Sequence, residues 1–153
     1  MTDSQPGVFL VAWSITVSDP EQSIRFYEAL GFRHCGGSVR TVERDSEMAR
    51  MMGLQSAKTR VDYLARPDGR LELNSFEEPK SFSEAALKPA NRTGANAMHF
   101  GCADANALAK RLVELGGKII AGSDGRYAMA DPDGVRIQFA SAKPEMIKAL
   151  FGE

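Results

Sequence analysis

Apolar and polar residues alternate near the start of the chain and then change to a helical spacing. Between residues 8 and 17 the apolar side chains recur at every second position, which is typical of a half-buried strand, with one face made of Val11, Trp13, Ile15 and Val17. Asp19-Pro20 then supplies a capping side chain and a first-turn proline, and Gly31 follows the last position of an apolar stripe. The pattern predicts a strand followed by a helix.

The rest of the chain divides into segments of the same two kinds. Strands are predicted over 32–42, 58–65 and 70–76 in the first half, and over 96–103, 118–121, 126–130 and 135–140 in the second. Helices are predicted over 45–53, 104–115 and 143–151. Proline, asparagine and glycine interrupt residues 78–95, which we predict to be a linker with room for a short helical turn over 82–87.

The two halves of the chain nearly repeat each other. Asp19 and Gly31 are separated by eleven residues, and so are Asp104 and Gly116. Each half also ends in a predicted hairpin with a Pro-Asp-Gly turn. We therefore predict a single domain over 1–153, with a first module at 8–77, the linker at 78–95, a second module at 96–141 and a C-terminal helix at 142–153.

Composition narrows the function classes. With 153 residues, 43% of them hydrophobic and 25% charged, the chain is long enough for one domain with a real core. A formal net charge of −1 provides no basic field for nucleic acid or for an anionic membrane. No apolar stretch of about 18 residues and no secretory leader is present, so we expect a cytoplasmic protein. Cys35 and Cys102 are expected to be free structural thiols.

Four motifs in this order resemble the vicinal oxygen chelate superfamily, and the resemblance covers residues 8–141. They are Val17-Ser18-Asp19, the segment from Ile24 to Phe32, Arg70-Leu71-Glu72-Leu73, and Asp131-Pro132-Asp133-Gly134. The superfamily includes glyoxalase I, methylmalonyl-CoA epimerase, extradiol dioxygenases, fosfomycin resistance enzymes and bleomycin resistance proteins. The resemblance implies an α+β fold in which two βαβββ modules pair into a curved mixed sheet around a cavity.

The resemblance also implies where a metal would bind. Metal-dependent members place His or Glu on the first and last strands of each module, and the corresponding positions here are Ala12, Ala97, Glu72 and Gln138. Alanine has no donor atom, whereas divalent metals need several oxygen or nitrogen ligands. We therefore expect no metal and no other cofactor, although a divalent metal held by relocated ligands stays open as an alternative.

Glu72 and His99 are the candidate catalytic residues. His99 lies two residues along its strand from Ala97 and so faces the same cavity. It would act as an acid or hydrogen-bond a ligand, join a relocated metal site with Glu72 and perhaps His34, or play a purely structural role. Glu72 would act as a base or anchor a cationic ligand. Its alternative is an ion pair with Arg70, Arg136 or Arg60.

Three further polar residues are predicted on the cavity faces of their strands, namely Ser14, Asn74 and Gln138. A few polar groups in an apolar cleft are typical of a ligand site, so these are the candidate substrate-binding residues. Hydrogen bonding at a sheet edge is the alternative for each of them.

These observations lead to one expected function and one alternative function. We expect a glyoxalase/bleomycin resistance-like protein that binds a small organic molecule in the cavity between its modules without a metal, with acid-base isomerase or lyase chemistry at Glu72 and His99 left open. The alternative function is that of a metal-dependent glyoxalase, epimerase or dioxygenase with relocated ligands. Family members often pair modules between chains, so a homodimer is expected, while pairing within one chain remains the alternative.

Overall fold

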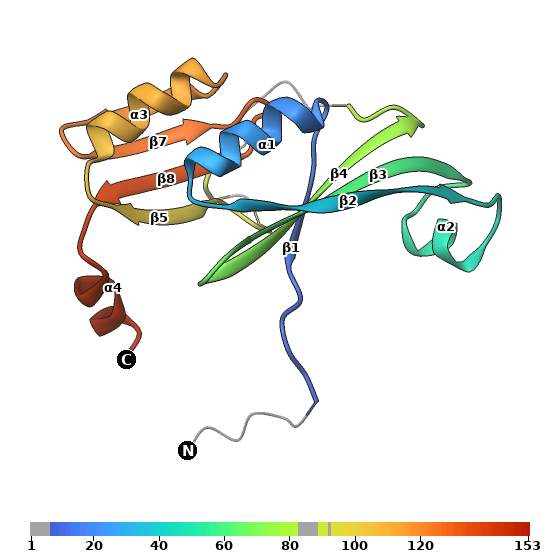
Figure 1. The fold of residues 1–153 in the computed structure, drawn as a ribbon, viewed down its shortest axis with the longest axis horizontal. Helices are drawn as coiled ribbons and strands as arrows, with labels where there is room; N and C mark the ends of the chain where they lie inside the picture. The colour runs from blue at the N-terminus through green and yellow to red at the C-terminus, as the bar shows by residue number, and fades with distance from the viewer. Residues whose placement is uncertain (1–6, 83–88, 92) are drawn as a thin grey trace.

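A computed structural model describes residues 7–82, 89–91 and 93–153, and two four-stranded sheets form its framework (Figure 1). The first sheet has the strand order β1-β4-β3-β2. Its strands are β1 (Trp13–Thr16), β2 (Arg33–Val42), β3 (Ala57–Arg66) and β4 (Gly69–Glu78). β1 runs parallel to β4, while β4-β3 and β3-β2 are antiparallel pairs.

The second sheet repeats this arrangement with the order β5-β8-β7-β6. Its strands are β5 (Met98–Cys102), β6 (Lys118–Ser123), β7 (Arg126–Ala130) and β8 (Arg136–Ser141). β5 is parallel to β8, and the remaining pairs are antiparallel. The predicted α+β fold of two βαβββ modules is therefore confirmed, with a separate sheet in each module: among the described residues no ladder joins β1 to β5.

Equivalent helices connect the first two strands of each module. α1 (Pro20–Ala29) and α3 (Ala105–Glu114) both begin after an aspartate whose Oδ1 accepts a hydrogen bond from a backbone N–H three residues later, at 3.1 Å in the first case and 3.0 Å in the second. Two shorter helices, α2 (Glu47–Met51) and α4 (Pro144–Leu150), lie outside this repeat. The helix predicted over 82–87 falls almost wholly outside the described residues.

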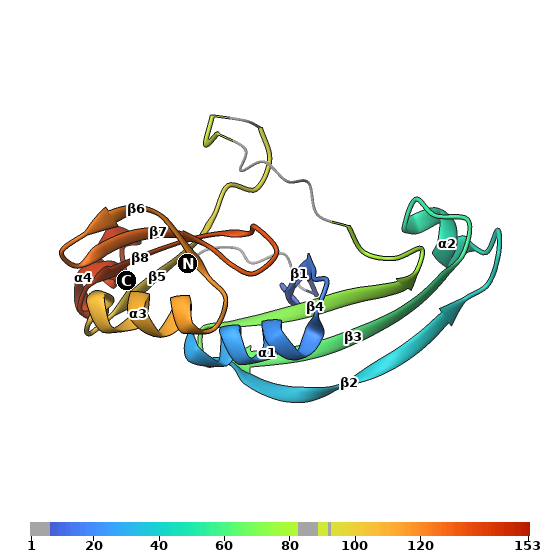
Figure 2. The same cartoon turned by 90° about the horizontal axis from the view of Figure 1, so that it is seen from above.

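Helices α1 and α3 lie side by side over the same face of the two sheets (Figure 2). Between them and the strands is one hydrophobic core that unites both modules, and its largest fully buried side chains are Phe26, Tyr27, Leu64, Leu73, Leu112, Met129 and Ile137. Neither α1 nor α3 covers the opposite face of the sheets. That uncovered face takes every second side chain of each strand, and the predicted site residues belong to it.

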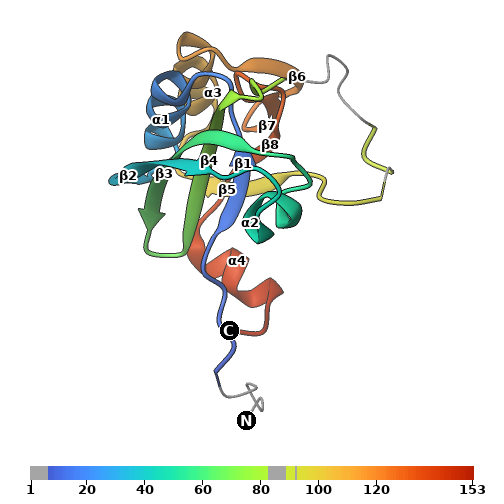
Figure 3. The same ribbon diagram turned by 90° about the vertical axis from the view of Figure 1, so that its right-hand side faces the viewer.

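The strand predicted from residue 8 is shorter in the structure, and its apolar face is exposed toward its N-terminal end. β1 begins only at Trp13, where its ladder with β4 starts at Leu71. Val17 is buried, but Val11 and Trp13 are 56% and 63% exposed. The N-terminal segment and α4 both project from the same side of the molecule in Figure 1, and Figure 3 agrees.

Candidate functional site

A cleft of about 840 Å³ lies where the first strands of the two modules approach each other. β1 and β5 contribute its two sides, the turn between β3 and β4 closes one end, and α4 borders the opening. Its apolar lining comes from both modules and from α4: Trp13, Ile15, Phe32, Leu71, Met98, Phe100, Val135 and Ile147. Small-molecule sites typically enclose about 300–1,000 Å³ with mostly apolar walls. This cleft is therefore large enough for an organic ligand.

Two of the predicted site residues, Ser14 and His99, line this cleft. Strand register places the others beside them, since Ser14 is paired with Glu72 and His99 with Gln138. Paired residues point to the same face of a sheet, and this face is the one that α1 and α3 leave uncovered. The predicted polar residues thus share one face, although Glu72, Asn74 and Gln138 lie beside the cleft and do not line it.

The polar side chains on the first sheet form a short network. Asn74 donates through Nδ2 to Ser14 Oγ at 2.5 Å, and this hydrogen bond does not use the hydroxyl proton of Ser14. Arg40 donates through Nη2 to Tyr63 Oη at 2.8 Å. Tyr63 is the cross-strand neighbour of Glu72, so the pattern of alternation could have indicated it as a site residue.

Glu72 makes no hydrogen bond or ion pair with the residues that the structure describes. Two of its three expected partners are engaged elsewhere: Arg60 contacts Asp62 and Glu21, and Arg70 donates to a backbone carbonyl. The carboxylate is half-buried and points to the uncovered face. No hydrogen bond or ion pair joins it to His99 within the described chain. A single copy therefore leaves the carboxylate available to a ligand or to another chain.

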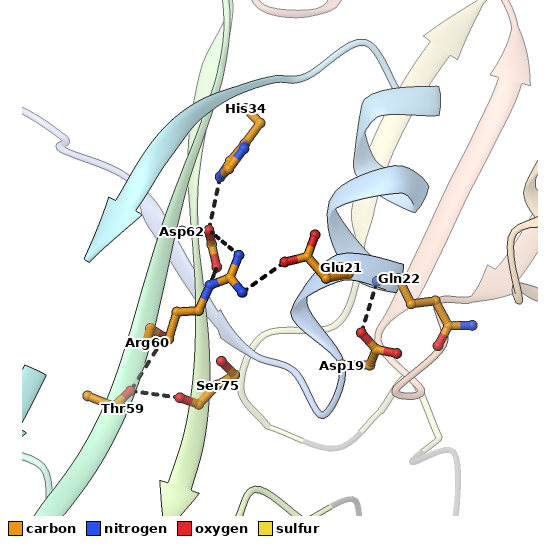
Figure 4. A network of polar contacts seen from close by, with 8 residues as sticks. All are labelled: Asp19, Glu21, Gln22, His34, Thr59, Arg60, Asp62 and Ser75. Carbon is orange, nitrogen blue, oxygen red and sulfur yellow. Dashed lines mark hydrogen bonds and ion pairs between the residues drawn. The ribbon is translucent and has the colours of Figure 1, made fainter. Parts of the chain in front are cut away.

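His34, named above as a possible further ligand of a relocated metal site, lies on the opposite side of the first sheet from Glu72. Its Nε2 is 2.9 Å from Asp62 Oδ1, and Asp62 is also contacted by Arg60, whose guanidinium reaches Glu21 on α1 (Figure 4). The strand register shifts between His34 and Gly37, and this irregularity places His34 opposite the core residue Leu64. His34 is therefore unable to join Glu72 in a metal site.

The donor set does not fit the metal that the fold family implies. Two of the four expected ligand positions are Ala12 and Ala97, which have no donor atoms. Within residues 7–82, 89–91 and 93–153, no three His, Cys, Asp or Glu side chains gather in a way that would hold an ion. Protein sites for divalent metals use several such ligands. The described residues of this face therefore lack the ligands that such a metal needs.

A buried hydrogen bond fixes the two modules relative to each other. Tyr27 Oη on α1 donates to Asp131 Oδ2 at 2.7 Å, and Asp131 also accepts from the backbone N–H groups of Val135 and Asp133. Burial raises the pKa of Asp131, and the three hydrogen bonds to its carboxylate offset part of this increase. Burial, followed by the Asp131 charge, holds the pKa of Tyr27 well above its usual range. Ser18 and Asp133 add an exposed link between the same two segments.

Arg66 forms part of the cleft wall, and sequence analysis did not identify it. Its guanidinium lies 5.5 Å from the ring centroids of Phe32 and Phe100, one ring from each module. It also binds Asp68 through two hydrogen bonds, at 2.5 and 3.1 Å, and donates to Leu30 O. Because the two rings and Leu30 come from distant positions in the sequence, no local pattern indicated the role of Arg66.

Comparison with known proteins identifies the fold. The model of the Glyoxalase/Bleomycin resistance protein/Dioxygenase superfamily matches residues 9–139. Similar solved structures include a glyoxalase family protein from Bacillus cereus (21% identity, covering 90% of this chain and 98% of that one, TM-score 0.71) and the trypanothione-dependent glyoxalase I of Leishmania major (20%, 95% and 94%, 0.64). The fosfomycin resistance protein FosX from Mesorhizobium loti is also similar (16%, 92% and 97%, 0.57).

One further comparison and the lengths of the helices both give negative results. A search of the curated proteins finds no match. In the part of the chain that the structure describes, every helix is too short or too polar to cross a bilayer.

Proposed function

Because the chain belongs to the Glyoxalase/Bleomycin resistance protein/Dioxygenase superfamily, we propose that it binds a small organic molecule in the cleft between its two modules. The observation that carries this proposal is the cleft itself, whose walls come from both modules. Aromatic and aliphatic side chains would bury the body of the ligand, while Ser14 and His99 would supply hydrogen bonds that orient it. Binding without a metal is supported by the alanines at two of the four expected ligand positions.

The single tryptophan of the chain offers a direct test, because Trp13 lines the cleft. The neutral fluorophore N-phenyl-1-naphthylamine absorbs where tryptophan emits, so its binding in the cleft should produce saturable energy transfer from Trp13. Ala97→Phe would fill the cleft and should weaken binding at least about tenfold, while Ala107→Phe, on the exposed surface of α3, should not. Absence of saturable transfer, or an equal loss in both variants, would contradict the proposal.

Acid-base chemistry at Glu72 is the second candidate function, and the free carboxylate supports it. A half-buried carboxylate with no cationic partner among the described residues can accept a proton from a carbon acid. His99 would supply the acid if a ligand spans the distance between the two strands, giving an isomerase or lyase. A compound found by screening against Trp13 fluorescence would be incubated in deuterium oxide and examined by NMR. Exchange that Glu72→Gln abolishes supports catalysis, and binding without exchange supports sequestration alone.

We also propose that two copies of the chain associate. Large apolar side chains are exposed on the two segments that project from the same side of the molecule: Val8, Phe9, Leu10, Val11 and Trp13, and Met146, Leu150 and Phe151 on or beside α4. Monomers rarely leave so many large apolar side chains in water on neighbouring projecting segments. Sedimentation velocity should give a dimer, which Phe9→Glu with Leu150→Glu should convert to a monomer. Phe82→Glu, at an exposed site outside these segments, is the matched control, and a monomeric parent protein would disprove the association.

A further inference from the structure

The charges that line the cleft differ in sign from the charge of the whole chain. The chain has a formal net charge of −1. The cleft is lined by the basic side chains of Arg66, Arg70, Lys143 and Lys148, against two acidic ones, Asp68 and Glu153. An excess of one sign in a cleft with apolar walls is less screened than the same charges on an open surface, because the walls exclude water.

One ion pair within this set leaves no free charge. Arg66 is bound to Asp68 through two hydrogen bonds, and its remaining contacts are to Phe32, Phe100 and a backbone carbonyl. All three guanidinium nitrogens therefore donate hydrogen bonds to the protein. Arg66 acts as a fixed part of the wall, and its charge is balanced by Asp68.

The other three cations are not balanced in this way. Arg70, Lys143 and Lys148 form no ion pair with any residue that the structure describes, and Glu153 is the one remaining carboxylate in the described lining. Arg70 is held in place because its Nη2 donates to Leu10 O at 3.0 Å, a neutral acceptor that leaves the positive charge uncompensated. Three cationic side chains against one acidic side chain leave the side chains that line the cleft with an excess of positive charge.

We propose that the cleft selects an organic anion, which names the ligand class for the binding function proposed above and rests on it. A ring-sized apolar body would pack against Trp13, Met98 and Phe100, and a carboxylate, phosphate or sulfonate group would lie toward Arg70 and the two lysines of the α4 segment. Guanidinium and ammonium groups bind these oxyanions through charge-assisted hydrogen bonds. A cationic ligand of the same size would meet like charges at the opening.

A pair of probes with the same ring system tests this proposal. 8-Anilino-1-naphthalenesulfonate is an anion, and N-phenyl-1-naphthylamine is its neutral counterpart, so energy transfer from Trp13 reports the binding of each in the neighbourhood of the cleft. The anion should bind more tightly than the neutral probe, and added sodium chloride should weaken only the anion. Ala97→Phe should remove binding of both, which separates the cleft from other apolar surface.

Charge variants then assign the preference to the cleft. Lys143→Gln with Lys148→Gln should weaken binding of the anion by about two- to thirtyfold, the range expected for two exposed charges, and leave the neutral probe unchanged. Glu153→Gln should tighten binding of the anion. The matched control is Lys110→Gln with Lys118→Gln, which makes the same change in net charge at exposed positions away from the cleft.

The outcomes separate this inference from the proposal on which it rests. If both probes bind equally well, or if the control pair weakens the anion as much as the cleft pair, the anion preference is overturned while binding in the cleft stands. If neither probe gives saturable transfer in the parent protein, the cleft is not a binding site and both proposals fail. Tighter binding of the anion that depends on Lys143 and Lys148 supports the inference.

Discussion

Replacing Tyr27 with phenylalanine tests the buried link between the two modules. The substitution keeps the ring in the core but removes the hydroxyl that donates to Asp131, whose side chain is only 2% exposed. A buried acceptor that loses its donor costs about 1–3 kcal/mol. For a chain of this length, each kcal/mol lowers the melting temperature by about 2–4 °C, so a decrease of about 2–12 °C is expected. Urea unfolding followed by circular dichroism measures the change in free energy directly.

The loss of stability in Tyr27→Phe should depend on pH because of the Asp131 carboxyl. Its folded pKa is raised by burial, so folding stability declines as pH rises from the unfolded pKa, about 3.9, through the folded pKa. The Tyr27 hydrogen bond lowers the folded pKa, and its loss raises that value further. The loss of unfolding free energy in Tyr27→Phe should therefore be small near pH 3, where Asp131 is protonated in the folded and in the unfolded protein. It should reach its full size at a pH above the folded pKa of Asp131 in the variant.

Tyr127→Phe is the matched control for this experiment. Tyr127 Oη also donates to a side-chain oxygen, Asn106 Oδ1 at 2.8 Å, but that bond lies at an exposed position where water can replace it. We expect a loss within about 0.5 kcal/mol for the control. An equal loss in the two variants, or a deficit in Tyr27→Phe that does not change with pH, would refute the argument from burial.

Three further substitutions test other parts of the structure. Gly122→Ala should cost at least about 2 kcal/mol, because Gly122 has a φ of +110° and an added Cβ would lie 2.2 Å from a backbone oxygen; Gly36→Ala, with positive φ but open space around it, should cost less in the same urea assay. Arg66→Lys should cost about 1–2 kcal/mol, since lysine cannot keep both the two-ring contact and the paired hydrogen bonds, and Arg111→Lys, at an exposed pair, is its control. Glu72→Gln should change the unfolding free energy by less than about 0.5 kcal/mol, and a larger loss would reveal a partner for Glu72.

Local rules explain why the element order was predictable. Asp19 and Asp104 cap their helices as their positions before an apolar stripe indicated, and the Pro-Asp-Gly segments form hairpin turns at the expected places. Each of these features depends on residues within one or two turns of chain. The duplication then gave two independent indications of the same module, which made the α+β fold predictable from sequence.

The site was only partly predictable, because strand alternation names a face without saying what covers it. Ser14 and His99 lie on the predicted face and line the cleft, but Trp13, predicted on a half-buried face, is largely exposed and lines the cleft as well. His34, a possible ligand of a relocated metal site, lies on the other face of the first sheet, next to a register irregularity that strand alternation does not foresee.

The sequence by itself therefore determined the helices, the strands, their repeat and the loss of two metal-ligand positions, Ala12 and Ala97. Periodicity and capping act over a few residues, and a missing donor atom needs no structure to be seen. Only the tertiary structure decided how the modules meet. It joined Tyr27 to Asp131, placed Arg66 between rings of both modules and gathered Arg70 with the lysines of the α4 segment at one opening. These contacts join residues distant in sequence, and packing of the shared core brings them together.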